Sequence, residues 1–218
     1  AAAPFQRLRE DNGCALNIKS EDLRQKVREK RIGNTFLFAV DASGSMGARE
    51  RMRAVKGAIF YMLQEAYQKR DRVGMVAFRR QKAELLLPIT RSVDLAQKCL
   101  AEMPTGGKTP LADGLSTALV TLGMLNKKDS ELEPVLILVT DGRANAIEEN
   151  SGDPVESALK MAEKIRKAKI TSVVIDTETD FIKLGVAKTV AKAMGATYYS
   201  LRSLSQEQIL RIVRNLDV

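Results

Sequence analysis

Two short apolar runs, each followed by an aspartate, constrain the fold of this chain more than any other feature. Residues 36–40 read FLFAV and lead into Asp41, and the run EPVLILVTDG at 133–142 contains Asp141. A strand with one exposed face alternates apolar and polar residues, whereas an unbroken apolar run is typical of a strand covered on both faces. The two runs therefore predict a parallel sheet with helices on either side.

Strand-like and helix-like segments alternate through residues 36–218. The sequence predicts strands at 36–40, 72–79, 83–90, 133–142, 170–177 and 196–202, and helices near 55–66, 93–103, 111–122, 154–168, 183–194 and 205–216. Repeated βα units with short connections predict an α/β fold with a doubly wound, mostly parallel sheet and helices on both faces. The second and third strands are close enough for a hairpin, and Pro88 favours an edge position, so we expect one antiparallel edge strand.

Residues 1–35 differ in composition from the rest and are interpreted as a charged linker or N-terminal arm, leaving 36–218 as the folded domain. A short strand near 16–18 and a helical stretch at 21–30 are expected within the arm. Its basic residues are candidates for contact with acidic surfaces, although a solvated basic linker explains them equally well. They are Lys19, Arg24, Lys26, Arg28, Lys30 and Arg31.

The composition is that of an ordinary globular protein, with 44% apolar and 28% charged residues. The net charge of +8 is compatible with nucleic-acid binding, but aromatic residues make up only 5% and do not alternate with basic ones. An acidic protein partner or simple solubility is favoured instead. No run approaches the length of a membrane span, and Cys14 and Cys99 have no metal-binding spacing. Reduced thiols fit the cytoplasm, or the plastid stroma in a plant or alga.

Two catalytic motifs are rejected. The stretch GGKT at 106–109 resembles the end of a phosphate-binding loop, but Glu102 stands where that motif needs glycine. The stretch around Ser45 resembles the nucleophile turn of hydrolases, but Ser43 replaces a required glycine. The chain has no histidine, which excludes a Ser-His-Asp triad; Lys108 could serve as an unusual base, but nothing in the sequence places it beside a serine.

Oxygen-bearing side chains at predicted loop positions favour a divalent cation. Asp41, Ser43, Ser45, Thr109 and Asp141 supply two carboxylates and three hydroxyls from three separate loops. Mg²⁺ prefers such oxygen ligands and retains several water molecules. Ligands of doubly wound sheets lie beyond the carboxyl ends of the strands, where Asp41 and Asp141 both fall. Each residue alone is more often a helix cap or turn residue, but the combination favours a metal site.

The three loop sequences together resemble a known family. DASGS, the threonine of GGKTPLADGL and the aspartate of VTDGRAN are similar to the metal-ion-dependent adhesion site of von Willebrand factor A-type (integrin I-like) domains. The resemblance implies a doubly wound fold of that type over 36–218. It also implies that Asp41, Ser43, Ser45, Thr109 and Asp141 bind Mg²⁺ (or Mn²⁺).

Nearly the whole chain, from AAAPFQRLR onward, resembles the carboxy-terminal part of the magnesium chelatase D subunit family. This resemblance implies an excised, non-catalytic domain whose partners are an AAA+ I-type chelatase subunit and a large porphyrin-binding H-type subunit. The complete enzyme would use ATP to insert Mg²⁺ into protoporphyrin IX for chlorophyll biosynthesis, or cobalt into corrin precursors in related chelatases.

The expected role of the cation is to dock a partner. With only two carboxylate ligands, the cation would keep an exposed coordination position for an aspartate or glutamate of another protein. Two other functions remain open from the sequence. One is an adhesion-type domain with extracellular ligands, and the other is an enzyme that binds a phosphorylated substrate through Mg²⁺.

Overall fold

The computed structural model describes residues 33–43, 48–69, 71–101, 105–128, 132–142, 153–178, 185–200 and 205–215. The chain divides into two units, residues 1–31 and 32–218, and every described residue belongs to the second. The strand expected near 16–18, the helix expected at 21–30 and the basic residues of the arm lie outside the described residues.

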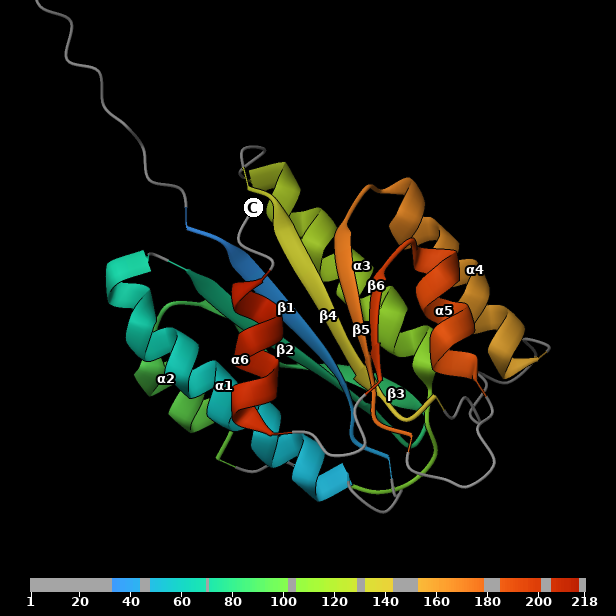
Figure 1. Cartoon of the computed structure of the whole chain (residues 1–218), viewed down its shortest axis with the longest axis horizontal. Helices are drawn as coiled ribbons and strands as arrows, with labels where there is room; N and C mark the ends of the chain where they lie inside the picture. The colour runs from blue at the N-terminus through green and yellow to red at the C-terminus, as the bar shows by residue number, and fades with distance from the viewer. Residues whose placement is uncertain are drawn as a thin grey trace, which may run out of the picture. The chain divides into compact units, whose positions relative to one another are not determined.

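A six-stranded sheet lies at the centre of this unit, in the order β3-β2-β1-β4-β5-β6 (Figure 1). All neighbouring strands are parallel except β2 and β3. The predicted mostly parallel sheet with one antiparallel edge strand is therefore confirmed. The strands are β1 (Thr35–Asp41), β2 (Arg72–Arg79), β3 (Lys82–Thr90), β4 (Pro134–Thr140), β5 (Thr171–Asp176) and β6 (Thr197–Ser200).

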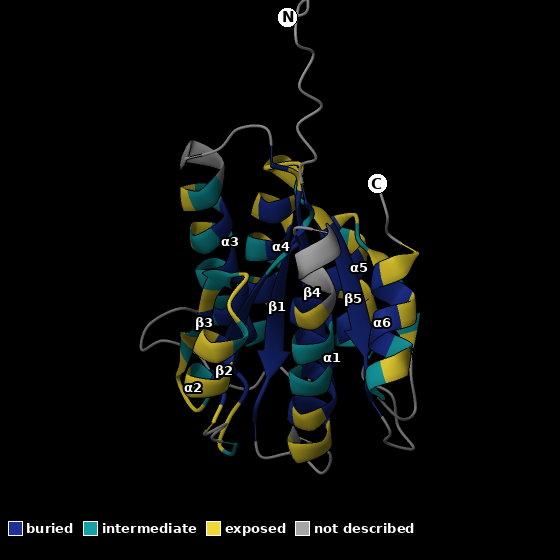
Figure 2. Cartoon of the chain, turned by 90° about the vertical axis from the view of Figure 1, so that its left-hand side faces the viewer, coloured by how far each residue is buried: buried dark blue, intermediate teal, exposed yellow. Residues whose placement is uncertain are grey.

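Helices cover both faces of the sheet, as Figures 1 and 2 show. One apolar core joins one face of the sheet to α1 (Ala48–Lys69), α6 (Gln206–Arg214) and residues of α2 (Val93–Cys99). A second core joins the other face to α3 (Leu111–Lys128), α4 (Pro154–Lys167) and α5 (Val186–Met194). In β1, Phe38 belongs to the first core and Leu37 to the second. This two-sided burial explains why residues 36–40 contain no polar side chain.

Pro88 lies in the edge strand, as predicted. Val73 pairs with Thr90 and Met75 with Leu87, so β3 has one more residue than β2 between these two pairs. Pro88 lies within this irregular stretch, where the missing amide hydrogen of proline costs least. The third strand is thus kept at the edge by its own sequence.

Several predicted element ends differ from the observed ones. The second helix ends at Cys99 rather than at 103, because Leu100 leaves the helical conformation with φ −102° and ψ 12°. The fifth helix begins at Val186, after Gly185 in a left-handed conformation. β4 ends at Thr140, so Asp141 lies one residue beyond the strand. Asp141 therefore lies in the connection that follows the strand.

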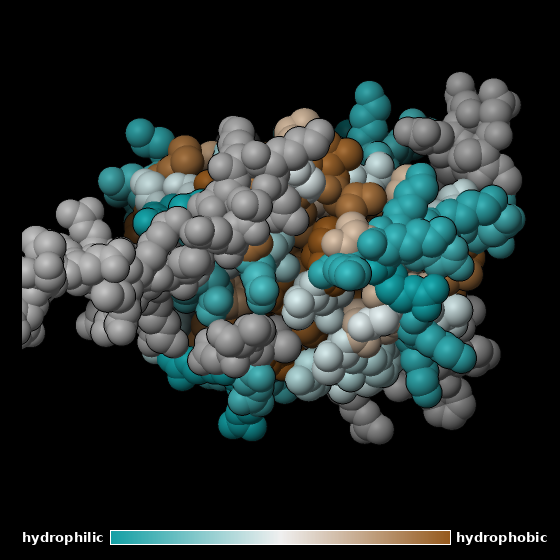
Figure 3. All heavy atoms as spheres, turned by 90° about the horizontal axis from the view of Figure 1, so that it is seen from above, coloured by the Kyte–Doolittle hydropathy of each residue, from teal (hydrophilic) through white to brown (hydrophobic). Residues whose placement is uncertain are grey.

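The exposed face of α4 carries an ion pair between residues four positions apart. Lys160 and Glu156 are 2.8 Å apart and more than half exposed, so their contribution to stability is small. Viewed from above, from the end of the sheet where the strands begin, hydrophilic side chains gather on the side of α4 and α5 (Figure 3). No helix among the described residues is long and apolar enough to cross a membrane.

Two glycines of α3 provide a matched test of how closely this helix packs on the sheet. A Cβ atom on Gly114 would lie 2.5 Å from the ring of Phe78 in β2, whereas nothing lies within 4 Å of a Cβ on Gly123. We expect Gly114→Ala to lower the free energy of unfolding by about 1–3 kcal/mol through overpacking. Gly123→Ala should raise it by about 0.5–1 kcal/mol, because alanine favours the helix. Urea denaturation measures both, and equal effects would contradict this packing.

Candidate metal centre

Asp41 ends the central strand β1 and is completely buried. Its Oδ1 atom accepts a hydrogen bond from the amide of Ser43 at 2.9 Å. Its Oδ2 atom accepts one from the hydroxyl of Thr140, at the end of the adjacent strand β4, at 3.3 Å. These two bonds hold the carboxylate between the ends of β1 and β4, yet a buried carboxylate has capacity for further partners.

The turn after β4 brings Asp141 to the same edge. The Thr140 hydroxyl that donates to Asp41 also accepts a hydrogen bond from the amide of Gly142 at 3.1 Å. Gly142 has φ +74°, and a Cβ atom there would lie 3.0 Å from the amide nitrogen of Ala187. Only glycine meets both conditions without strain. Asp141 is therefore held at the carboxyl end of the sheet with 6% of its surface exposed.

The loop that carries Thr109 is attached directly to the residue after Asp41. The amide of Gly106 donates to the carbonyl oxygen of Ala42 at 2.8 Å. Gly107 has φ +93°, and a Cβ atom there would clash with Arg80, the residue that follows β2. Thr109 itself is 1% exposed. The predicted site residues thus come from segments that meet at one edge of the sheet.

The structure brings four of the five predicted ligands, or the loops that carry them, to the same edge of the sheet. Asp41, Ser43 and Asp141 are buried and grouped at the ends of β1 and β4, and the loop of Thr109 adjoins them. Ser45 lies outside the described residues. Their role as cation ligands remains a prediction.

Arg51, which the sequence analysis did not identify, lies beside both aspartates. It is 3% exposed, and its Nε atom donates to the backbone carbonyl of Asp41 at 3.3 Å. Its Nη1 atom lies 3.6 Å from a carboxylate oxygen of Asp141 and 3.5 Å from the hydroxyl of Thr177 after β5. One side chain of α1 therefore contacts the ends of three strands. A signal was available, because Arg51 occupies the same helical stripe as Val55 and Ile59.

The charges at this edge are not balanced. Burial, and next the neighbouring Asp141, raise the pKa of Asp41, while Arg51 and the hydrogen bonds from Ser43 oppose the shift, and the pKa that results is about 7 instead of 3.8. Two carboxylates face one guanidinium, so the ionised site has a net charge of −1. A divalent cation among these oxygen donors would stabilise both carboxylates, and the residues present fit Mg²⁺ on this ground.

A third buried acid at this edge already has its own partners. Asp176, at the end of β5, accepts hydrogen bonds from the amide of Glu178 and the hydroxyl of Tyr198. Burial and the contact with Asp176 raise the pKa of Tyr198 to about 12. Within the described ranges, no set of three or more His, Cys, Asp or Glu side chains is arranged to hold a metal. A cation here would therefore depend on hydroxyl oxygens as well as carboxylates.

Comparison with family models and curated proteins gives matches over most of the chain. A model of the von Willebrand factor type A domain matches residues 36–144, and a model of the AAPxQ domain matches residues 1–28. An uncharacterized protein of Methanocaldococcus jannaschii is 43% identical over 79% of this chain and 99% of its own length.

Two magnesium-chelatase subunits are also similar to this chain. The 67 kDa subunit of Heliobacterium mobile is 37% identical over 99% of this chain, and the 60 kDa subunit of Cereibacter sphaeroides is 38% identical over 92%. The matched segment is only 34% and 36% of these two subunits. The chain therefore spans about a third of the chelatase subunits that it matches.

Solved structures share the fold. BatB of Bacteroides thetaiotaomicron superposes with a TM-score of 0.60 at 20% identity, covering 84% of this chain and 98% of BatB. The von Willebrand factor domain of the pilus tip protein Mfa5 of Porphyromonas gingivalis gives 0.62 at 11% identity, covering 84% and 96%. The superpositions confirm the predicted fold type, and at these identities they show the fold alone.

Removing Arg51 tests its place between the strand ends. We expect Arg51→Met to lower the free energy of unfolding by about 3 kcal/mol or more, because it leaves buried carboxylates without their cation. Arg53→Met, at an exposed position of the same helix, is the matched control and should change stability by less than about 0.5 kcal/mol. Urea denaturation measures both variants, and a small loss for Arg51→Met would contradict a stabilising role.

The raised pKa of Asp41 predicts a pH dependence of stability in the absence of metal. The protonated carboxyl stabilises the folded state, and this contribution is complete below the unfolded pKa of 3.8 and lost as the pH rises through about 7. Between about pH 5 and pH 8, the free energy of unfolding in EDTA should fall by about 2–3 kcal/mol more than in Asp41→Asn. Identical pH profiles for the two proteins would show that Asp41 does not titrate in this range.

Proposed function

Because the chain belongs to the von Willebrand factor type A domain family and is similar to magnesium-chelatase subunits, we propose that it is the metal-ion-dependent protein-binding domain of a chelatase D-type subunit. In this proposal the domain has no catalytic site of its own. It holds a multi-subunit chelatase together and transmits movement driven by ATP hydrolysis in another subunit.

One observation supports the metal-dependent part of the proposal. Asp41 and Asp141 are buried at one edge of the sheet with Arg51 as the cation between them. Keeping two desolvated carboxylates so close costs free energy unless further positive charge is available. Two neutral hydrogen-bonding side chains at these positions would avoid this cost. A cation-binding role explains why both buried carboxylates are present.

Each predicted ligand would have its own role in binding the cation. Asp41 and Asp141 provide the negative charge, directly or through water, and Ser43, Ser45 and Thr109 contribute hydroxyl oxygens. Bound Mg²⁺ (or Mn²⁺) supplies a hard cationic centre that an outside carboxylate can join. Arg51 keeps the charge of the protein ligands low, so that an aspartate or glutamate of a partner protein still adds useful negative charge.

The proposed partners follow from the chelatase similarity. They are an AAA+ I-type subunit and a porphyrin-binding H-type subunit, in a complex that inserts Mg²⁺ into protoporphyrin IX or performs a related metal insertion. The inserted metal is the substrate and is distinct from the ion at the candidate site. The proposed location is the cytoplasm, or the plastid stroma in a plant or alga.

Calorimetry with Mg²⁺ and Mn²⁺ tests the cation site. We expect uptake by the wild-type chain, and a loss of affinity of at least about tenfold in Asp41→Asn and Asp141→Asn, because each removes one of the two charged ligands. Thr109→Val should weaken binding by a smaller factor. Asp94→Asn, at an exposed position of α2, controls for the loss of one negative charge and should bind like wild type.

The same proteins then test the docking function. The wild-type chain should capture the I-type or H-type subunit of a chelatase in Mg²⁺ and release it in EDTA, while Asp41→Asn should capture neither. Absence of cation uptake by the wild-type chain would refute the proposal. Capture that persists in EDTA would refute docking through the cation.

A further inference from the structure

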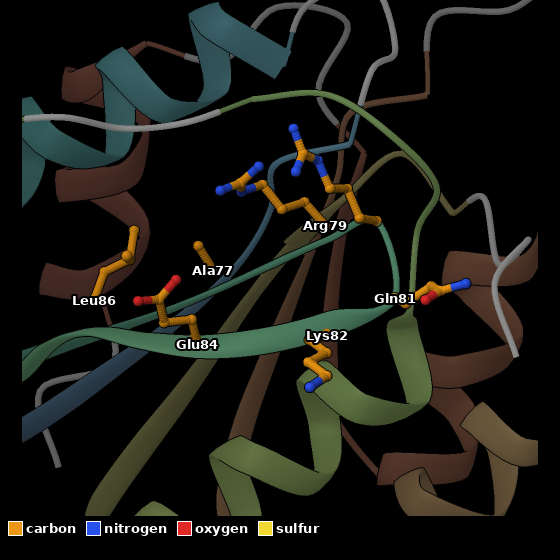
Figure 4. A pocket seen from close by; sticks show the side chains of 7 residues that line it. Ala77, Arg79, Gln81, Lys82, Glu84 and Leu86 are labelled. Carbon is orange, nitrogen blue, oxygen red and sulfur yellow. The ribbon is translucent and has the colours of Figure 1, made fainter. Parts of the chain in front are cut away.

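The turn between β2 and β3 forms a pocket of about 260 Å³ that the cation site does not use. Three basic residues, Arg79, Arg80 and Lys82, contribute to its lining, together with one acid, Glu84, and apolar side chains. Figure 4 shows that Arg79 extends on the same side of the hairpin as Glu84, whereas Lys82 points the other way. The two arginines are therefore the main source of positive charge in this pocket.

This pocket lies next to the candidate metal centre. Phe78 of β2 is the register partner of Asp41, and its carbonyl oxygen accepts a hydrogen bond from Ala42 at 3.0 Å. Arg79 follows directly, so its backbone lies roughly 6 Å from that of Asp41 by ordinary sheet spacings. Arg80 abuts Gly107, in the loop that carries Thr109.

The backbone conformation of Arg80 disfavours arginine, so formation of the turn does not explain why an arginine occupies this position. Arg80 has φ +58°, a region in which two-residue hairpin turns normally have asparagine, aspartate or glycine. An arginine at this position strains the backbone, and the pocket has no excess of acidic residues to pair with it. Among the described residues, neither Arg79 nor Arg80 forms an ion pair. Two guanidinium groups are therefore available beside the centre.

We infer that the Arg79–Arg80 pocket binds a second acidic side chain of the same partner segment whose first carboxylate completes the cation's coordination. This inference rests on the proposed function and specifies the partner as an extended segment with two acidic residues. Two or three residues of an extended segment span roughly 6–10 Å, which covers the backbone separation of about 6 Å between Asp41 and Arg79 that follows from the strand register. The first acid gives metal-dependent attachment, and the second gives register and specificity.

An acidic peptide fits this pocket better than a nucleic acid. The described lining has no aromatic side chain on which a base could stack. Ala77 and Leu86 instead provide apolar contact for the methylene groups of a glutamate. The same cluster thus offers a short apolar surface that ends in two guanidinium groups.

The test uses two synthetic peptides and the ¹⁵N-labelled 218-residue chain saturated with Mg²⁺. One glycine–serine peptide contains a single glutamate, and the other has a second glutamate three residues further along. NMR titration should show the two-glutamate peptide binding about three- to tenfold more tightly, because its second contact is intramolecular once the first is made. In Arg79→Gln/Arg80→Gln, both peptides should bind with the affinity of the one-glutamate peptide, with unchanged Mg²⁺ uptake by calorimetry.

Lys164→Gln/Lys167→Gln is the matched control, because it removes two positive charges from the last turn of α4. It should retain the preference for two glutamates. Equal binding of the two peptides to the wild-type chain, or a preference that survives in the arginine variant, would overturn this inference while leaving the cation site intact. Absence of Mg²⁺ uptake would overturn both. Tighter binding of a short oligothymidylate to the same hairpin would identify a nucleic-acid surface instead and would also overturn the inference.

Discussion

The ion pair between Arg51 and Asp141 is the interaction on which the carboxyl edge of the sheet depends. Parallel strands end together, so their terminal polar groups are brought into a small region with little access to water. Arg51 contacts the carbonyl of Asp41, the carboxylate of Asp141 and the hydroxyl of Thr177, and it thereby joins α1 to the ends of β1, β4 and β5. A lysine would not provide the same set of directed contacts, because its single ammonium group lacks the planar array of donors that arginine has.

In the proposed function, this arrangement would connect stability to cation and partner binding. Without a cation, the buried edge favours a proton on Asp41, whose pKa is raised to about 7. A divalent ion would take the place of that proton and of the missing positive charge. Binding of an acidic partner would then add the negative charge that a cation with few charged ligands still lacks. Proton, cation and partner would all act on the same small group of buried oxygens.

The basic pocket of the β2–β3 turn adjoins the candidate metal centre. The loop of Thr109 and the β2–β3 turn meet at Gly107 and Arg80, so the candidate centre and the basic pocket share a boundary.

The M. jannaschii relative is matched over 99% of its length, whereas the chelatase subunits are matched over about a third of theirs. A segment of this extent thus occurs both as nearly a whole protein and as part of a longer one.

The sequence alone determined the fold and the candidate ligands. The unbroken apolar residues 36–40 required burial on both faces, and Pro88 required an edge, because both constraints act on the strand's own backbone and side chains. Only the tertiary structure decided what surrounds Asp41. The helical stripe that Arg51 shares with Val55 and Ile59 indicates only that Arg51 faces the sheet, and nothing in the sequence around Arg79 and Arg80 indicates which loop they adjoin. The residues that these arginines adjoin at the carboxyl edge of the sheet lie far away along the chain. Strand order brings them together, and no local sequence pattern encodes strand order.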